Sequence, residues 1–206
     1  MSNREPIKTT KEEIISYWSK YQDECELSVD WAEASERCWR CGCTRTLERC
    51  HITPYALGGK DAPENLVLLY NRCHTEEPNV NDPEIMWEWI KAYRVPLYDT
   101  FWTIEGMRKY QFIYKHSFKS AVSYILTHTT IQKNENEISE YLKQEIQSIH
   151  RKSSTHFGQN YRNTATYAGK FRMLIKSLAK EMNVSIEKMD EEISENASTW
   201  WTGCAL

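Results

Sequence analysis

The chain has 206 residues, enough for one domain or for a small domain with an extension. Hydrophobic residues make up 40% and aromatic residues 12%, with eight Trp, which excludes a wholly disordered chain. The net charge of −3 argues weakly against a nucleic-acid partner, but it hides an asymmetry. Residues 150–180 hold seven basic and no acidic residues, whereas residues 1–37 and 181–206 are acidic. A local charge of +7 suits a polyanion binder, and equally a solvated helix face balanced by the acidic tail.

The sequence also bears on the cellular setting. Its longest apolar run, NLVLLY at residues 65–70, is far too short to span a membrane. The N-terminus lacks the apolar core of a signal peptide, so we expect a cytoplasmic protein with no membrane partner. Five of the seven Cys lie between Cys38 and Cys73. Without a secretion signal, such clustering favours a metal site over disulfides.

The first predicted helix begins with a capping box, in which Thr10 is followed by Glu13 at the third helical position. Ile14, Trp18 and Tyr21 then mark one apolar face at helical spacing.

The next clear helix starts at Asp82, an N-cap residue, with Pro83 at the first helical position. Its predicted inner face is Ile85, Trp89, Ile90 and Tyr93.

The C-terminal half reads as a series of helices. Residues 100–117 are ambiguous but favour helix, and residues 153–164 form a polar loop. Apolar residues at helical spacing predict helices over 117–131 (Phe118, Val122, Ile125, Leu126), 135–150 (Ile138, Leu142, Ile146, Ile149) and 164–182 (Phe171, Leu174, Ile175, Leu178, Met182). A compact segment rich in potential metal ligands is therefore embedded among helices.

Cys38 and Cys41 form a Cys-x-x-Cys pair followed by Gly42. Two thiolates at this spacing on a tight turn form half of a tetrahedral zinc site. A redox motif would need a strand before it and a helix after it, whereas CGCTRTLERCH looks like a knuckle feeding a strand. Structural metal is the better interpretation.

Cys73 is the third predicted zinc ligand, and Tyr70 occupies the place where a second Cys-x-x-Cys pair would have its other thiol. The fourth ligand is then Cys50 or Cys43. Side chains alternate along a strand, so Cys50 could turn to the zinc while His51 turns to solvent.

His51, Asn65 and His74 surround the Gly-Gly turn beside this cluster. Phosphodiester hydrolysis needs a base to activate water, a cation to stabilise the developing charge, and a group that orients the base. His51, His74 and Asn65 match these needs in that order. A single His on a short strand is more often a structural residue with a satisfied hydrogen bond.

The segment ERCHITPYALGGKDAPENLVLLYNRCH resembles the core of the HNH endonucleases, the ββα-metal fold in its zinc-knuckle form. The resemblance runs from about Arg37 to Asn79. It rests on the Cys pair, on His51 with Ile52 and Pro54, on Gly58-Gly59, on Asn65-Leu66, and on Cys73-His74.

The resemblance implies an α+β fold, with a small zinc-bound ββα-metal nuclease core inside a mostly α-helical protein. It implies that His51 is the general base, that His74 binds a catalytic Mg²⁺, Mn²⁺ or similar ion, and that Asn65 fixes the loop or the base. It also implies that DNA is the substrate. The expected organisation is a helical segment 1–36, the core 37–80 and a helical extension 81–206.

Cys50 departs from the family pattern, in which Asp or His at this position also binds the catalytic ion. Either Cys50 compensates for Tyr70 as a zinc ligand, which we favour, or it makes the active-site ion softer. A third reading is that catalysis has decayed and the motif is a zinc-stabilised scaffold.

The basic segment 150–180 is the candidate DNA-contacting surface. Gln159, Asn160 and Asn163 could reach base edges, and an ordinary solvated helix face is the alternative. The predicted phosphate contacts are Arg151, Lys152, Arg162, Lys170, Arg172 and Lys176.

The leading hypothesis is a metal-dependent HNH endonuclease that cuts DNA, in a restriction, phage-defence or mobile-element role. The alternative is a catalytically decayed, zinc-stabilised module that binds nucleic acid or protein. A palindromic target would imply a homodimer.

Overall fold

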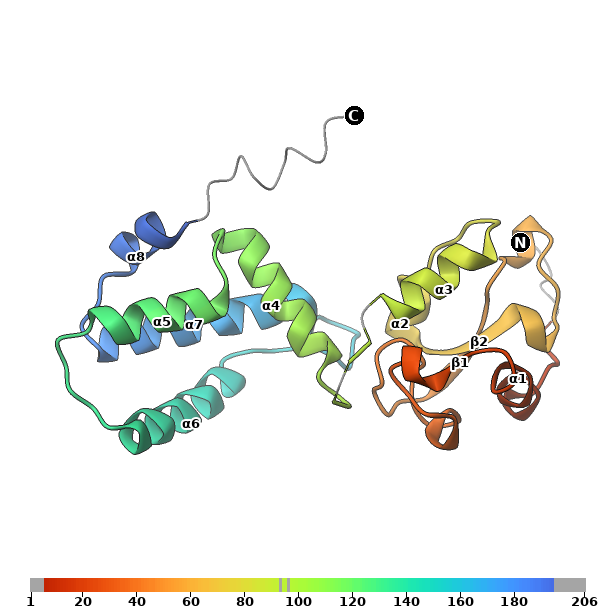
Figure 1. Cartoon of the computed structure of the whole chain (residues 1–206), viewed down its shortest axis with the longest axis horizontal. Coiled ribbons are helices and arrows are strands. Elements are labelled where there is room, and N and C mark those ends of the chain that lie inside the picture. Colours follow the sequence, from red (N-terminus) through yellow and green to blue (C-terminus); the bar gives the residue numbers. More distant parts are fainter. Residues whose placement is uncertain (1–5, 93, 96, 195–206) are drawn as a thin grey trace, which may run out of the picture. The chain divides into compact units, whose positions relative to one another are not determined.

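A computed structural model describes residues 6–92, 94–95 and 97–194, and the chain forms two compact units, Met1–Phe101 and Trp102–Leu206 (Figure 1). The protein is mostly helical with one small antiparallel sheet, as expected for the α+β class. Both predicted domain boundaries, at residues 36 and 80, fall inside the first unit, and the predicted core 37–80 stays a prediction. Among the described helices, none has the length and apolar character needed to cross a bilayer.

The first unit is built around a two-stranded sheet. Strands β1 and β2 pair antiparallel from Leu47 opposite Tyr70 to His51 opposite Leu66, and α2 follows β2 directly. The helices and strands are α1 (Lys11–Trp18), β1 (Leu47–His51), β2 (Leu66–Tyr70), α2 (Asn71–Thr75) and α3 (Pro83–Lys91), with 3₁₀ turns at Glu24–Glu26, Trp31–Glu33, Tyr55–Leu57 and Pro63–Asn65.

Helix α1 begins with the predicted capping box between Thr10 and Glu13. Ile14 and Trp18 are buried, and the Trp18 indole donates a hydrogen bond to the Leu66 carbonyl at 2.8 Å, which joins α1 to the start of β2. The prediction was wrong for Tyr21, which is 65% exposed because the helix ends at Trp18.

Helix α3 has the predicted N-cap at Asp82, whose side chain accepts from the Glu84 amide, and Pro83 at its first position. Of its predicted inner face, Ile90 is confirmed as buried, whereas Ile85 and Trp89 were wrong because the buried face is centred on Met86 and Trp87. Met86, Trp87 and Ile90 are buried, whereas Ile85 is 39% exposed and Trp89 is half-buried; Tyr93 lies outside the described residues.

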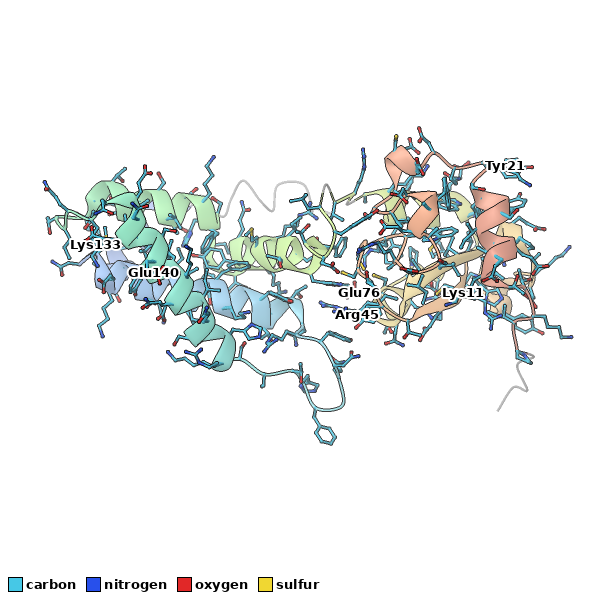
Figure 2. The ribbon with its side chains drawn as sticks, turned by 90° about the horizontal axis from the view of Figure 1, so that it is seen from below. Lys11, Tyr21, Arg45, Glu76, Lys133 and Glu140 are labelled. Carbon is cyan, nitrogen blue, oxygen red and sulfur yellow. The ribbon has the colours of Figure 1, made fainter. Side chains whose placement is uncertain are left out.

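The second unit is helical, with α4 (Phe101–Tyr114), α5 (Phe118–His128), α6 (Glu135–Arg151), α7 (Thr164–Glu181) and α8 (Ile186–Ile193). Its buried core is Tyr110, Ala121, Tyr124, Ile125, Ala168, Ile175, Leu178, Ala179, Met182 and Met189. Lys133, labelled in Figure 2 just before α6, forms an ion pair with Glu181 at the end of α7. α4 crosses α7 so closely that a Cβ on Gly106 would lie 2.3 Å from the Cβ of Tyr167.

The four helices predicted in this unit are confirmed, and the loop between α6 and α7 matches the predicted polar loop. Most predicted inner residues contribute to the core or pack against it, including Phe118, Ile138 and Phe171. Two predicted inner residues were wrong, since Leu126 is 41% and Ile146 is 51% exposed.

Candidate metal centre and active site

The Cys-x-x-Cys pair lies on a tight knuckle of the first unit. The Cys38 amide donates to the Cys43 carbonyl at 3.1 Å, and the Gly42 amide donates to the Cys38 carbonyl at 2.8 Å. Gly42 has φ +66°, and a Cβ there would lie 2.7 Å from the Ser28 carbonyl oxygen. Because both the conformation and the space require glycine, the sequence CGC closes the turn that brings the two thiols together.

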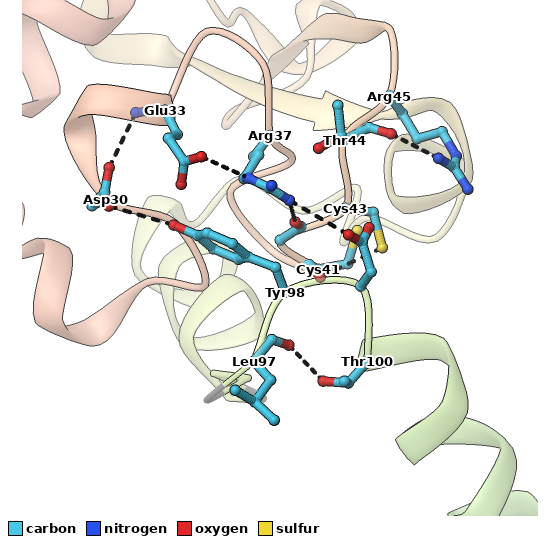
Figure 3. A network of polar contacts seen from close by, with 12 residues as sticks. Asp30, Glu33, Arg37, Cys41, Cys43, Thr44, Arg45, Leu97, Tyr98 and Thr100 are labelled. Carbon is cyan, nitrogen blue, oxygen red and sulfur yellow. Dashed lines mark hydrogen bonds and ion pairs between the residues drawn. The ribbon is translucent and has the colours of Figure 1, made fainter.

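An outer network holds the knuckle in place (Figure 3). Arg37 donates to Glu33 at 3.2 Å and to the Gly42 carbonyl at 3.0 Å. Its guanidinium lies 3.9 Å from the centre of the Tyr98 ring. The residues before and after the knuckle are therefore tied to its turn.

Cys38, Cys41 and Cys73 form one buried group, with ligand atoms within 4.8 Å of one another and no exposed area. Burial raises the pKa of Cys38 to about 12. Contacts with Cys38 and Cys41, followed by burial, raise the pKa of Cys73. Three adjacent buried thiols suit a thiophilic cation, which would displace their protons on binding.

Arg40 lies against this group. Its side chain donates to the Cys73 sulfur at 3.8 Å and pairs with Glu76 at 2.9 Å, although the residue is only 5% exposed. Its guanidinium also lies 4.0 Å from the Trp89 ring centre. A buried positive charge beside sulfur favours the thiolate, which is the metal-binding form.

The two candidates for a fourth ligand lie in different surroundings. Cys43 is close to the thiol trio, since its sulfur donates to the Cys41 carbonyl at 3.7 Å and contact with Cys41 lowers its pKa. Cys50 belongs to a second group with His74 and Glu77, again with ligand atoms within 4.8 Å of one another. The structure thus separates Cys50 from the three thiols with which the sequence had grouped it.

His74 stands at the centre of this second group. Its Nδ1 lies 2.6 Å from Glu48 and its Nε2 lies 3.5 Å from Glu77. Partial burial raises the pKa of Glu48, but hydrogen bonds with His74 and Asn71 outweigh it and leave that pKa below its usual value. An ionised Glu48 at Nδ1 orients the imidazole so that Nε2 faces the space beside Glu77.

Glu77 is the least solvated carboxylate of this group, with its side chain 8% exposed. Burial raises its pKa to about 7, with the charge of Glu48 adding to this and that of His74 opposing it. Its Oε2 is buried without a hydrogen-bond partner among the described residues. A carboxylate in this state is a suitable cation ligand.

His51 lies on the opposite side of β1 from Cys50, as strand alternation predicts, because Cys50 is fully buried and His51 is half-buried. His51 lines a cavity of about 240 Å³ together with His74, Glu77, Asp61 and Arg49. The two histidines from β1 and α2 therefore share one cavity.

Asn65 fastens the loop that follows His51. Its Oδ1 accepts from the Thr53 amide at 2.8 Å, and its Nδ2 donates to the carbonyls of Thr53 and Lys60 at 3.1 and 3.0 Å. The loop is closed tightly, because a Cβ on Gly59 would lie 1.8 Å from the Thr53 oxygen. Asn65 thus contacts the loop backbone.

Four residues that line the cavity or contact His74 were not predicted from the sequence, namely Glu48, Arg49, Asp61 and Glu77. Two had a local signal: Glu48 is two residues before Cys50 on the same strand face, and Glu77 is three residues after His74. Asp61 had none, because it is placed by hydrogen bonds from the Lys8 and Thr9 amides.

The predicted DNA-contacting residues all lie on α6, the following loop and α7 of the second unit. Arg162 donates to Ser153 at 3.0 Å, and Lys170 lies 3.4 Å from His150. The charges of Arg162 and Lys170 lower the pKa of His150. Positive charge therefore gathers where the loop joins its two helices.

Arg172 differs from the other basic residues. Its side chain is 12% exposed, forms a two-pronged ion pair with Asp190, and lies 4.6 Å from the Tyr114 ring centre. Asn163 caps α7 by accepting from the Thr166 amide. Both side chains are engaged within the fold. The loop also presents Phe157, which is 98% exposed.

A hairpin, a short helix, a buried thiol trio and two histidines on one cavity form a ββα module whose cysteine cluster could hold a metal ion. Residues 36–79 match the family model described as HNH endonuclease, so the chain contains an HNH domain. No curated protein and no solved structure matches the chain.

Proposed function

We propose that this protein is a metal-dependent HNH endonuclease that hydrolyses phosphodiester bonds in DNA. The observation that carries the proposal is the shared cavity of His51 and His74 within the segment that matches the family model. HNH nucleases act on DNA, so a phosphodiester is the expected occupant of that cavity.

In this proposal His51 is the general base that takes a proton from the attacking water. Asp61 lines the same cavity, where its carboxylate would stabilise the imidazolium that forms when His51 takes the proton. Asn65 keeps the loop after His51 in place through its bonds to Thr53 and Lys60.

His74 and Glu77 would hold the catalytic cation, with Glu48 fixing the His74 ring. A bound Mg²⁺, Mn²⁺ or similar ion supplies charge stabilisation at the phosphate and the leaving oxygen. The donor set fits such an ion, because imidazole and carboxylate both bind divalent metals. The thiol of Cys50 shifts the preference towards a softer ion such as Zn²⁺.

Cys38, Cys41 and Cys73 would bind a structural Zn²⁺, with Cys43, the candidate that contacts Cys41, as the fourth ligand. The zinc would tie the knuckle to the start of α2, where Cys73 precedes His74. Folding of the knuckle and placement of the catalytic histidine are then coupled.

The basic residues of the second unit would bind DNA phosphates. The gathered charge of Arg151, Lys152, Arg162, Lys170 and Lys176 supports this role. Arg172 is a weaker candidate because Asp190 already neutralises it. A cytoplasmic restriction, phage-defence or mobile-element nuclease is the setting we propose, with a homodimer if the target is palindromic.

The test is cleavage of supercoiled plasmid DNA with Mg²⁺, Mn²⁺, Zn²⁺ or EDTA. We expect cutting by the unmodified protein in at least one metal, and its loss in EDTA and in His51→Ala. The control is His128→Ala, which removes a histidine on α5 whose Nδ1 contacts the Tyr124 carbonyl. Equal activity of His51→Ala and the unmodified protein would rule out His51 as the base.

The second candidate function is a zinc-stabilised binding module with a decayed nuclease core. It is motivated by Cys50, a thiol where the family pattern has an oxygen or nitrogen ligand. It requires bound zinc and retained DNA or protein binding without cleavage of plasmid or genomic DNA in any metal.

A further inference from the structure

Arg49 lies on β1 two residues before His51, so both side chains lie on the same face of the strand. Glu48 and Cys50 lie on the other face, next to His74. Arg49 nevertheless lines the same cavity as His51 and His74. A guanidinium therefore forms part of the wall of the cavity that contains the proposed base.

In the described parts of the chain, the Arg49 guanidinium makes one hydrogen bond. Its Nη1 donates to the Thr9 carbonyl at 3.0 Å. The guanidinium has five N–H donors, so four of them make no hydrogen bond within the described residues. Within the described residues it forms no ion pair, and its full positive charge remains available to an anion.

Neither carboxylate of the cavity, Asp61 or Glu77, forms an ion pair with Arg49 in the described residues. Asp61 accepts from the Lys8 and Thr9 amides at 2.6 and 3.2 Å, and Glu77 faces His74 at 3.5 Å. Neither neutralises Arg49. The cavity wall thus presents one guanidinium without an ion-pair partner in the described residues, two imidazoles, and two carboxylates that do not pair with it. The guanidinium suits a phosphate, and the carboxylates suit a cation that would accompany that phosphate.

We propose that Arg49 binds a non-bridging oxygen of the scissile phosphodiester and so positions the phosphorus between His51 and His74. This inference rests on the proposed endonuclease function. Arg offers two parallel N–H groups to a phosphate, which fixes its orientation as well as its position. The same contact strengthens as negative charge builds up on the phosphoryl oxygens during attack, so Arg49 assists the reaction as well as binding.

A structural tether is the competing role, since the bond to Thr9 also holds the segment before α1. A tether requires one N–H and no charge. The two roles therefore predict different effects of salt on DNA binding. If Arg49 contacts a phosphate, its loss reduces the salt dependence of the affinity; if Arg49 is only a tether, its loss leaves that dependence unchanged.

The experiment measures the affinity of the full chain for a fluorescent 20-bp DNA duplex over a range of NaCl concentrations. The buffer contains neither added Mg²⁺ or Mn²⁺ nor a chelator, so that zinc held by the thiols is retained. Arg49→Gln is expected to weaken binding about 5- to 30-fold and to reduce the slope of log affinity against log salt by about 1. Arg49→Lys, which keeps the charge, is expected to stay within about threefold of the unmodified protein.

The matched control is Arg45→Gln. Arg45 is an exposed arginine of the same unit whose Nη1 donates to a backbone carbonyl, that of Thr44, at 2.8 Å. It does not line the cavity. It is expected to change affinity less than twofold. If the Arg45 and Arg49 variants lose the same amount of DNA affinity, the loss reflects the overall positive charge of the protein, and the proposal is overturned.

An unchanged affinity and salt slope in Arg49→Gln, with or without a lower melting temperature, would also overturn it and leave the tether. Plasmid cleavage by the same proteins distinguishes failure of the endonuclease function from failure of the Arg49–phosphate contact. If the unmodified protein cuts nothing, the endonuclease function fails while the binding data still decide the phosphate contact. If it cuts, Arg49→Lys is expected to lower kcat about 10- to 100-fold with little change in KM, because a point charge replaces the planar fork.

Discussion

Replacement of Asn65 by Ala tests whether this side chain fixes the loop after His51. Three hydrogen bonds, to the Thr53 amide, the Thr53 carbonyl and the Lys60 carbonyl, would be lost. At about 0.5–1.5 kcal/mol each, their removal costs roughly 1.5–4.5 kcal/mol of unfolding free energy. The neighbouring Gly59 packs its backbone onto Thr53, so the loop cannot close around the missing amide without moving.

The assay is urea unfolding of the metal-loaded protein followed by Trp fluorescence. The control is Asn71→Ala, which removes one exposed hydrogen bond to Glu48 and should cost less than about 1 kcal/mol. A loss for Asn65→Ala no larger than that of the control would refute the reasoning. In the endonuclease proposal, Asn65→Ala also loses plasmid cleavage while keeping the same zinc content, because the thiols are untouched.

Three further perturbations test other parts of the molecule. Cys38→Ser is expected to unfold or strongly destabilise the first unit and to abolish tight zinc binding, and an unchanged thermal melt with zinc still bound would exclude the structural site. Arg162→Glu combined with Lys170→Glu should weaken DNA binding more than tenfold at low salt without altering zinc content; unaltered affinity removes the basic segment from the DNA surface. Burial raises the pKa of Asp190, but hydrogen bonds from Arg172 and His116 outweigh it and depress that pKa, so its stabilising effect is present above about pH 4 and is lost as the carboxylate protonates at lower pH. Asp190→Asn should therefore lower the melting temperature of the second unit at pH 7, and the difference should shrink towards pH 3; a pH-independent difference would contradict the linkage.

The sequence correctly predicted the features that depend only on residues close together along the chain. The Thr10–Glu13 capping box, the N-cap at Asp82 and the Cys38–Cys41 knuckle each depend on residues within four positions of one another, and each is present in the structure. The alternation of Cys50 and His51 likewise follows from strand geometry alone.

Predictions failed where several local solutions were equally good. In α3, the run IMWEWI offers apolar residues on adjacent faces, so periodicity cannot choose between a face with Ile85 and Trp89 and one with Met86 and Trp87. The choice is made by tertiary contacts, because Trp87 packs against Trp18 with ring centres 4.6 Å apart. Tertiary contacts also explain why Asp61 was not predicted, since its hydrogen-bond partners lie more than 50 positions away in the sequence.

Cys50 illustrates how a single position connects the metal chemistry to the fold. The antiparallel register pairs Cys50 with Val67, and its sulfur is grouped with His74 and Glu77 instead of the knuckle thiols. Burial, followed by the charges of Glu77 and Glu48, raises the pKa of Cys50. A neutral thiol is a poor ligand, and only a cation with high thiolate affinity displaces its proton. In the proposed nuclease, Mg²⁺ would therefore depend on His74 and Glu77 with a protonated Cys50, whereas Zn²⁺ would recruit all three. The position that departs most from the family pattern is thus the one expected to select the ion.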